Sequence, residues 1–128
     1  MIKTVFIFLT LSLLLTKTYG QKDEIYRNEG KTYGHAGSSY NVDILTLESN
    51  GEYQLMYQKF YSKKLKNKNI FFDLTTENGT WSKKQDTLYI KSAENKKVVK
   101  FLVLKKNKIA LVIEEVEISP AKWKKINY

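Results

Sequence analysis

Residues 40–60 read YNVDILTLESNGEYQLMYQKF, and this stretch decides the fold class. In its second half, Tyr53, Leu55 and Tyr57 fall on one side of an extended chain, and the polar Gln54 and Gln58 fall on the other. A two-residue period of this kind is typical of a β-strand with one buried face. The Asn-Gly pair in the middle adopts positive φ angles readily and favours a tight hairpin turn. The stretch therefore predicts an antiparallel hairpin made of strands 40–48 and 52–60.

Further strand-like segments follow the hairpin, with turn residues every eight to twelve positions. Such spacing is typical of a β-sandwich or a β-barrel. Because the links are short, neighbouring strands are expected to run antiparallel. The sequence therefore predicts an all-β, antiparallel up-and-down meander of about eight strands that closes into a small barrel or flattened barrel. The further strands are expected at 70–75, 80–83, 86–92, 97–104, 108–117 and 121–128, with turns at Glu77-Asn78-Gly79 and Ser119-Pro120.

The first twenty residues have the layout of a secretory signal peptide that is cleaved before Gln21. Lys3 precedes an apolar run over 5–15, which is shorter than the roughly 20 residues that a spanning helix needs. We therefore expect an exported protein, periplasmic or secreted, with no transmembrane segment in the mature chain. The absence of cysteine excludes a lipoprotein and disulfide bonds. The expected division is a signal peptide (1–20), a polar, glycine-rich N-terminal segment (21–39) and a β domain (40–128).

The strand expected at 97–104 is apolar on both faces, and one of these faces carries Val98, Leu102 and Leu104. A strand that is covered on one side only should have polar residues on the other. The segment 21–39 is expected to begin as a loose lead-in or a short helix and to continue as a glycine-rich loop. We expect this segment to cover the second apolar face; the alternative is that the face binds a partner.

Lysine carries almost all of the positive charge of this chain, whose net charge is +9. Nucleic-acid readers generally rely on arginine, so no nucleic-acid partner is expected. The lysines gather in predicted turns, and alternate turns of a meander lie at the same end of a barrel. On the predicted strand count, three lysine groups form one basic rim for anionic partners, made of Lys63, Lys64, Lys66, Lys68, Lys83, Lys84, Lys105 and Lys106.

Residue types that support catalysis or metal binding are scarce. His35 is the only histidine and there is no cysteine, whereas zinc and copper sites recruit several such ligands. The acidic residues Glu114, Glu115 and Glu117 are interpreted as a charged strand edge that discourages aggregation. No pairing of a nucleophile with a base is visible. We therefore expect no catalytic residue, no metal site and no cofactor in a protein that is not an enzyme.

Three short motifs follow one another in the expected β domain: Leu47-Glu-Ser-Asn-Gly-Glu-Tyr53, Asn78-Gly-Thr-Trp81 and Asp86-Thr-Leu-Tyr-Ile90. This arrangement resembles the small lipocalin-like (calycin-type) β-barrel domains of exported bacterial proteins. The resemblance extends over about 40–113 and implies a closed meander. Many such domains have no assigned activity, and others resemble lipid binders. No functional residue is carried over from the family.

Two functions are compatible with these expectations. The first is an exported, non-enzymatic β-barrel binding module for a small hydrophobic ligand. The alternative is an envelope or secreted protein-interaction or structural module with a filled core, which would present its lysine-rich rim or its apolar sheet face to a partner. A monomer is expected in either case. The predicted ligand-lining residues are Tyr53, Leu55, Tyr57, Trp81, Leu88 and Phe101.

Overall fold

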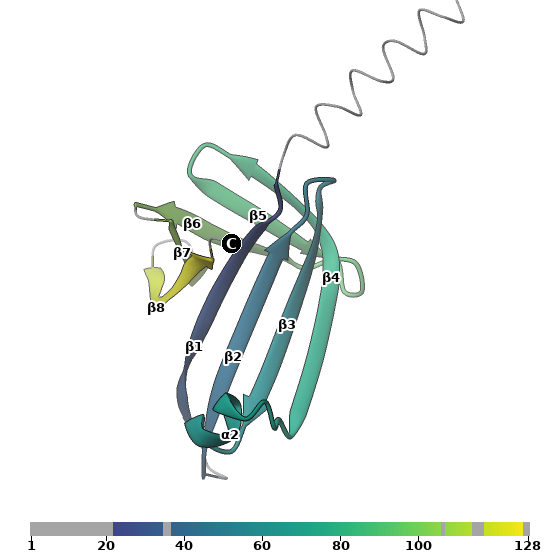
Figure 1. The fold of residues 1–128 in the computed structure, drawn as a ribbon. Coiled ribbons are helices and arrows are strands. Elements are labelled where there is room, and N and C mark those ends of the chain that lie inside the picture. The colour runs from purple at the N-terminus through teal and green to yellow at the C-terminus, as the bar shows by residue number, and fades with distance from the viewer. Residues whose placement is uncertain (1–21, 35–36, 106, 114–116, 127–128) are drawn as a thin grey trace, which may run out of the picture.

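The computed structural model describes residues 22–34, 37–105, 107–113 and 117–126. Each strand pairs antiparallel with the next, and the last strand pairs with the first, so the sheet closes into an up-and-down barrel (Figure 1). The predicted all-β meander of eight strands is therefore confirmed. The elements are β1 (Glu24–Gly34), β2 (Gly37–Leu47), β3 (Glu52–Phe60), α2 (Lys63–Asn67), β4 (Asp73–Lys84), β5 (Thr87–Ser92), β6 (Val98–Leu104), β7 (Lys108–Ile113) and β8 (Glu117–Ile126).

The expected signal peptide lies outside the described residues, as do His35, Lys106, Glu114 and Glu115. Within the part of the chain that the structure describes, no helix is long and apolar enough to span a bilayer.

The two sides of the barrel differ in length. Strands β1, β2, β3 and β4 contain 11, 11, 9 and 12 residues, whereas β5, β6 and β7 contain 6, 7 and 6; β8 has 10 residues but pairs irregularly with the short β7. We call β1–β4 the long wall and β5–β8 the short wall. The long wall extends beyond the short wall at the end that carries α2 (Figure 1). We call this the α2 end, and the opposite end, with the Asn50-Gly51 turn, the far end.

Strand β1 was not predicted, and the expected role of the segment 21–39 is wrong. Its residues pair with β2 from Glu24–Leu47 to Gly34–Gly37, and with β8 on the other side. The segment therefore forms part of the barrel wall instead of covering the outer face of β6. After Tyr26, the side chains of β1 that share its inner face are Asn28, Gly30 and Thr32, so no apolar alternation marks the strand.

Strand β4 replaces the two strands predicted at 70–75 and 80–83, and the turn predicted at Glu77-Asn78-Gly79 is wrong. Gly79 lies inside the strand, where it pairs with β3 on one side and β5 on the other. A Cβ atom there would lie 2.0 Å from the Lys91 carbonyl oxygen and 2.7 Å from the Tyr53 ring. The glycine is thus required by close backbone approach rather than by a turn.

The predicted break at Ser119-Pro120 is also wrong, because both residues lie within β8. The register between β7 and β8 shifts between Ala110 and Val112, which leaves the proline in an irregular stretch of the ladder. A β-bulge tolerates a residue without a backbone N–H, so the proline does not end the strand.

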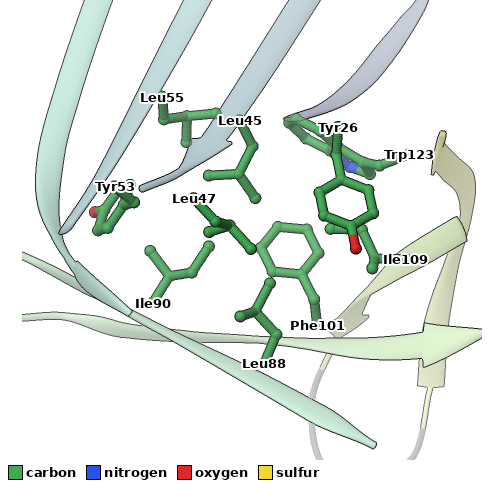
Figure 2. Close-up of a cluster of buried hydrophobic side chains, with 10 residues drawn as sticks. All are labelled: Tyr26, Leu45, Leu47, Tyr53, Leu55, Leu88, Ile90, Phe101, Ile109 and Trp123. Carbon is green, nitrogen blue, oxygen red and sulfur yellow. The ribbon is translucent and has the colours of Figure 1, made fainter. Parts of the chain in front are cut away.

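Ten buried side chains fill the interior toward the far end (Figure 2). Both walls contribute to this cluster, which we call the packed core. Phe101 and Trp123 meet edge to face, with ring centroids 5.7 Å apart. The packed core consists of Tyr26, Leu45, Leu47, Tyr53, Leu55, Leu88, Ile90, Phe101, Ile109 and Trp123.

The space at Gly79 makes a specific prediction about stability. Gly79→Ala should destabilise the protein by about 3 kcal/mol, because the new methyl group would overlap backbone and a buried ring. Gly30→Ala is the matched control, since a Cβ at this strand position meets nothing within 4 Å. Urea unfolding of both variants measures the difference. Equal stability of the two variants would contradict the role of Gly79.

Candidate functional site

The six predicted ligand-lining residues do lie together, but as packed side chains. Tyr53, Leu55, Leu88 and Phe101 belong to the packed core, and Tyr57 and Trp81 pack against it. Core residues are between 0 and 7 % exposed, so a water-sized probe hardly reaches them. A ligand-sized space beside them would leave more of their surface accessible. The space among the four core residues is therefore filled by the side chains themselves, whereas Tyr57 and Trp81 are only partly buried.

Beyond the packed core, the inner face of the long wall becomes polar. Asn28 is opposite Asp43, Asp43 is opposite Tyr57, and Tyr57 is opposite Thr75 in the strand register. Since alternate residues of a strand share a face, these four side chains follow the core residues toward the α2 end. We call them the polar row. Thr75 is exposed and the other three are half-buried.

The polar row contains a carboxyl group in an unfavourable setting. Burial raises the pKa of Asp43, although a hydrogen bond with Asn28 and the charge of Lys59 act in the opposite direction. Burial, followed by the charges of Glu77 and Asp43, raises the pKa of Tyr57 to about 12. The Tyr57 hydroxyl is therefore protonated at neutral pH and can donate a hydrogen bond.

A second tyrosine connects the polar row with the packed core. The Tyr53 hydroxyl donates a hydrogen bond to Glu77 Oε1 at 2.7 Å. Burial and this carboxylate raise the pKa of Tyr53. Glu77 follows Thr75 on the inner face of β4, so it lies where the polar part of the interior meets the apolar part. The carboxylate thus has a fixed donor on the core side.

The short wall presents apolar groups at the same end. Val99 shares the inner face of β6 with Phe101, yet it is 40 % exposed. The interior is therefore open to solvent where β6 begins. Leu111, on the neighbouring strand, packs against the core from this side. Val99 pairs with Ile90 of the packed core in the strand register, so the inner face of the short wall stays apolar up to the start of β6.

The predicted single basic rim is wrong as a geometric arrangement. In the up-and-down barrel, the connections after β1, β3, β5 and β7 lie at one end and the others at the far end. Because β4 is one strand rather than two, the lysines of the β3–β4 connection lie at the α2 end, whereas Lys83, Lys84 and Lys105 lie at the far end. Lys66 is also engaged in the fold, with its Nζ 3.2 Å from Glu29 Oε2.

The sequence contained a signal for Asp43 that the prediction missed. This aspartate shares an inward face with Leu45 and Leu47, in a strand whose alternation was recognised. A charged residue on an apolar face is informative because burial of an unpaired carboxylate is unfavourable. No comparable signal exists for Asn28, because its strand has no apolar period.

The amide, carboxyl and phenol groups of the polar row can donate and accept hydrogen bonds. Among the described residues, no group of three or more His, Cys, Asp and Glu side chains could hold a metal ion. A groove of about 400 Å³ is lined mainly by outer-face residues of the long wall, among them Ile44, Gln54 and Met56, and also by Leu55 and Glu77.

The raised pKa of Asp43 predicts how one substitution changes stability with pH. The contribution of this carboxyl to the stability of the folded protein is full below its unfolded pKa. It is lost as pH rises through the higher folded pKa. Asparagine does not titrate. The melting temperature of Asp43→Asn minus that of the unmodified protein should therefore increase between about pH 3 and about pH 7. Thermal unfolding across this range measures the difference. A difference that does not change with pH would show that Asp43 titrates normally.

No family model, no curated protein and no solved structure matches this chain. The eight-stranded antiparallel barrel is compatible with the lipocalin-like architecture that the sequence resembles. The fold is thus established at the level of architecture, as a closed up-and-down β-barrel.

Proposed function

We propose that this protein is an exported, non-enzymatic, lipocalin-like binding module that takes a small amphiphilic ligand at the α2 end of its interior. The observation that carries the proposal is the polar row, which continues the inner face of the long wall past the packed core. Mouths of β-barrels are frequent ligand sites, in which a few polar groups orient a mostly apolar molecule. Export rests on the sequence of residues 1–20.

The side chains at this end favour a particular ligand chemistry. Asp43 accepts hydrogen bonds when ionised, and Tyr57 donates one. A ligand with hydroxyl or amino groups along one side would satisfy them, while a hydrocarbon side would contact Val99 and Leu111. Val99 is 40 % exposed, and Leu111 is partly buried against the packed core. A purely hydrophobic ligand would offer no hydrogen bond to Asp43 or Tyr57, which is unfavourable for polar groups that it covers.

A test begins with native mass spectrometry of the protein purified gently from its own host. We expect a bound mass of small-molecule size that is released on denaturation. Tyr57→Phe and Asp43→Asn should reduce its occupancy roughly tenfold, because each removes one hydrogen-bonding group from the ligand. Gln58→Ala is the matched control, since Gln58 is the next residue of β3 and points to the outer face. It should retain the ligand.

Two results would overturn this proposal. Protein that carries no small molecule, and whose melting temperature does not respond to amphiphilic compounds, would favour the alternative function. A ligand that remains bound in the Tyr57 and Asp43 variants but is lost on Met56→Ala would place the site in the outer groove. The intact mass of the same sample also reports whether the chain begins at Gln21.

The alternative function is a surface-interaction module with a filled core. The low exposure of all ten core residues favours it, because a barrel of this size is often filled completely by its own side chains. In this case the binding surface would lie on the outside of the barrel.

A further inference from the structure

Exposed apolar side chains gather at one end of this barrel. Five of the large exposed ones among the described residues lie in the connection between β3 and β4 and at the start of β4. Their exposed fractions run from 41 % to 69 %, although apolar side chains of this size are usually buried. We call residues 61–74 the docking segment, and these five are Tyr61, Ile70, Phe71, Phe72 and Leu74.

Local hydrogen bonds hold the docking segment in a defined shape. Ser62 caps α2 by accepting a hydrogen bond from the Leu65 N–H at 3.3 Å. After the helix, Asn69 adopts φ 57°, and the Ile70 N–H donates to the Leu65 carbonyl at 2.9 Å. This is a Schellman-type ending, which reverses the chain sharply. The Phe72 N–H then bonds the Lys59 carbonyl at 2.9 Å. The exposed apolar residues are therefore presented by an ordered loop.

Side-chain contacts fasten this loop to β1 and β3 on the outer face of the long wall. Lys66 pairs with Glu29, which also accepts a hydrogen bond from the Tyr40 hydroxyl at 3.0 Å. Phe71 meets the buried Phe60 edge to face, with centroids 6.4 Å apart. Lys66 and Phe71 thus hold the segment in place, and the remaining lysines and apolar residues face outward.

A stacked aromatic pair lies on the outside of the docking segment. The rings of Tyr61 and Phe72 are 4.3 Å apart and inclined by only 25°. Both rings remain exposed, so their stacking does not remove them from water. Ile70 is exposed beside this part of the chain. These three side chains form an apolar surface that another phase or molecule could cover.

The same segment is strongly basic. Lys63, Lys64 and Lys68 are exposed, and the first turn of α2 contains no acidic residue. The acidic residue within the segment, Asp73, is opposite Lys59 in the strand register. An adjoining groove of about 330 Å³ is lined by two lysines, three serines and two tyrosines: Lys31, Lys63, Ser38, Ser39, Ser62, Tyr40 and Tyr61.

We propose that the docking segment binds the α2 end of the barrel to the surface of an anionic lipid bilayer. Tyrosine and phenylalanine are suited to the boundary between headgroups and acyl chains. Lysines beside them contact lipid phosphates, and the adjoining groove can receive a headgroup. A nucleic acid would use the lysines but leave Ile70 uncovered, and an apolar protein surface would leave the lysines unpaired. The bilayer matches both features.

This proposal is independent of the ligand site inside the barrel. The polar row is on the inner face of the long wall, whereas the docking segment packs on its outer face through Phe60 and Glu29. Substitutions in one should leave the other intact.

Sedimentation with lipid vesicles tests the proposal. All eight strands lie between Glu24 and Ile126, so a chain that begins at Gln21 contains the whole barrel without the apolar run at 5–15. We expect this chain to bind vesicles with about one third phosphatidylglycerol, and not vesicles of phosphatidylcholine alone. Added salt should weaken the binding.

Three variants locate the surface, each checked first for an unchanged urea midpoint. The triple variant K63Q/K64Q/K68Q should lose affinity roughly a hundredfold, because each lysine at an anionic surface contributes roughly fivefold. Its matched control, K83Q/K84Q/K105Q, removes equal charge from the far end and should retain most of the affinity. I70S/F72S should lose at least about tenfold, since it removes the inserted apolar groups.

Each contrary result overturns the proposal. Equal losses in the two lysine variants would mean that diffuse positive charge is responsible. Unchanged binding of I70S/F72S would mean that no apolar side chain enters the bilayer. No binding of anionic vesicles would leave the docking segment as a surface for a protein partner.

Discussion

The barrel depends on the close contact between β4 and its neighbours at Gly79. Here a single strand pairs with Tyr53 of β3 on one side and with Ser92 of β5 on the other. The Tyr53 ring lies where a Cβ at Gly79 would be, and its hydroxyl bonds Glu77. One residue without a side chain therefore lets the sheet pass from the long wall to the short wall. Closure of the barrel, packing of the core and placement of one carboxylate all follow from this contact.

Because the two walls differ in length, the two ends of the barrel differ in how deeply their inner side chains are buried. At the far end both walls face each other, and ten side chains fill the space between them. At the α2 end the long wall continues without an equal partner, so its inner face tolerates Asn28, Asp43 and Tyr57. Its outer face there is covered by the docking segment, beneath which Phe60 is 2 % exposed. The packed core thus lies toward the far end, and the polar row lies toward the α2 end.

The sequence predicted the parts of the fold in which burial alternates. The hairpin at 40–60 and the strands at 86–92 and 97–104 have apolar inner positions, and the structure contains β2, β3, β5 and β6 there. Strand β1 could not be recognised in this way, because the face it presents to the interior is polar after Tyr26. The strand is formed by backbone pairing with β2. The periodicity of the side chains gives no sign of this pairing.

The error in the predicted basic rim follows from one ambiguous residue, Gly79. An Asn-Gly pair predicts a turn at Asn50-Gly51, where Gly51 has φ 90°, and the same pair at Asn78-Gly79 lies inside a strand. Sequence alone does not distinguish a glycine needed for positive φ from one needed for close packing. Because the prediction divided β4 into two strands, it assigned the later turns to the wrong ends of the barrel. It therefore placed lysines from opposite ends in one rim. The gathering of exposed aromatic residues around α2 became visible only when their burial was known.

The seam between β1 and β8 carries a consequence for how the chain assembles. Only three residue pairs close it among the described residues, and Ile25 pairs there with Ile126. The contact thus joins the two ends of the folded chain across about 100 residues, while every other strand pair is local. During synthesis, the first strand must wait with one edge unpaired until the ten residues of β8 emerge. The barrel therefore closes late in synthesis, and only when β8 is intact can it pair with β1.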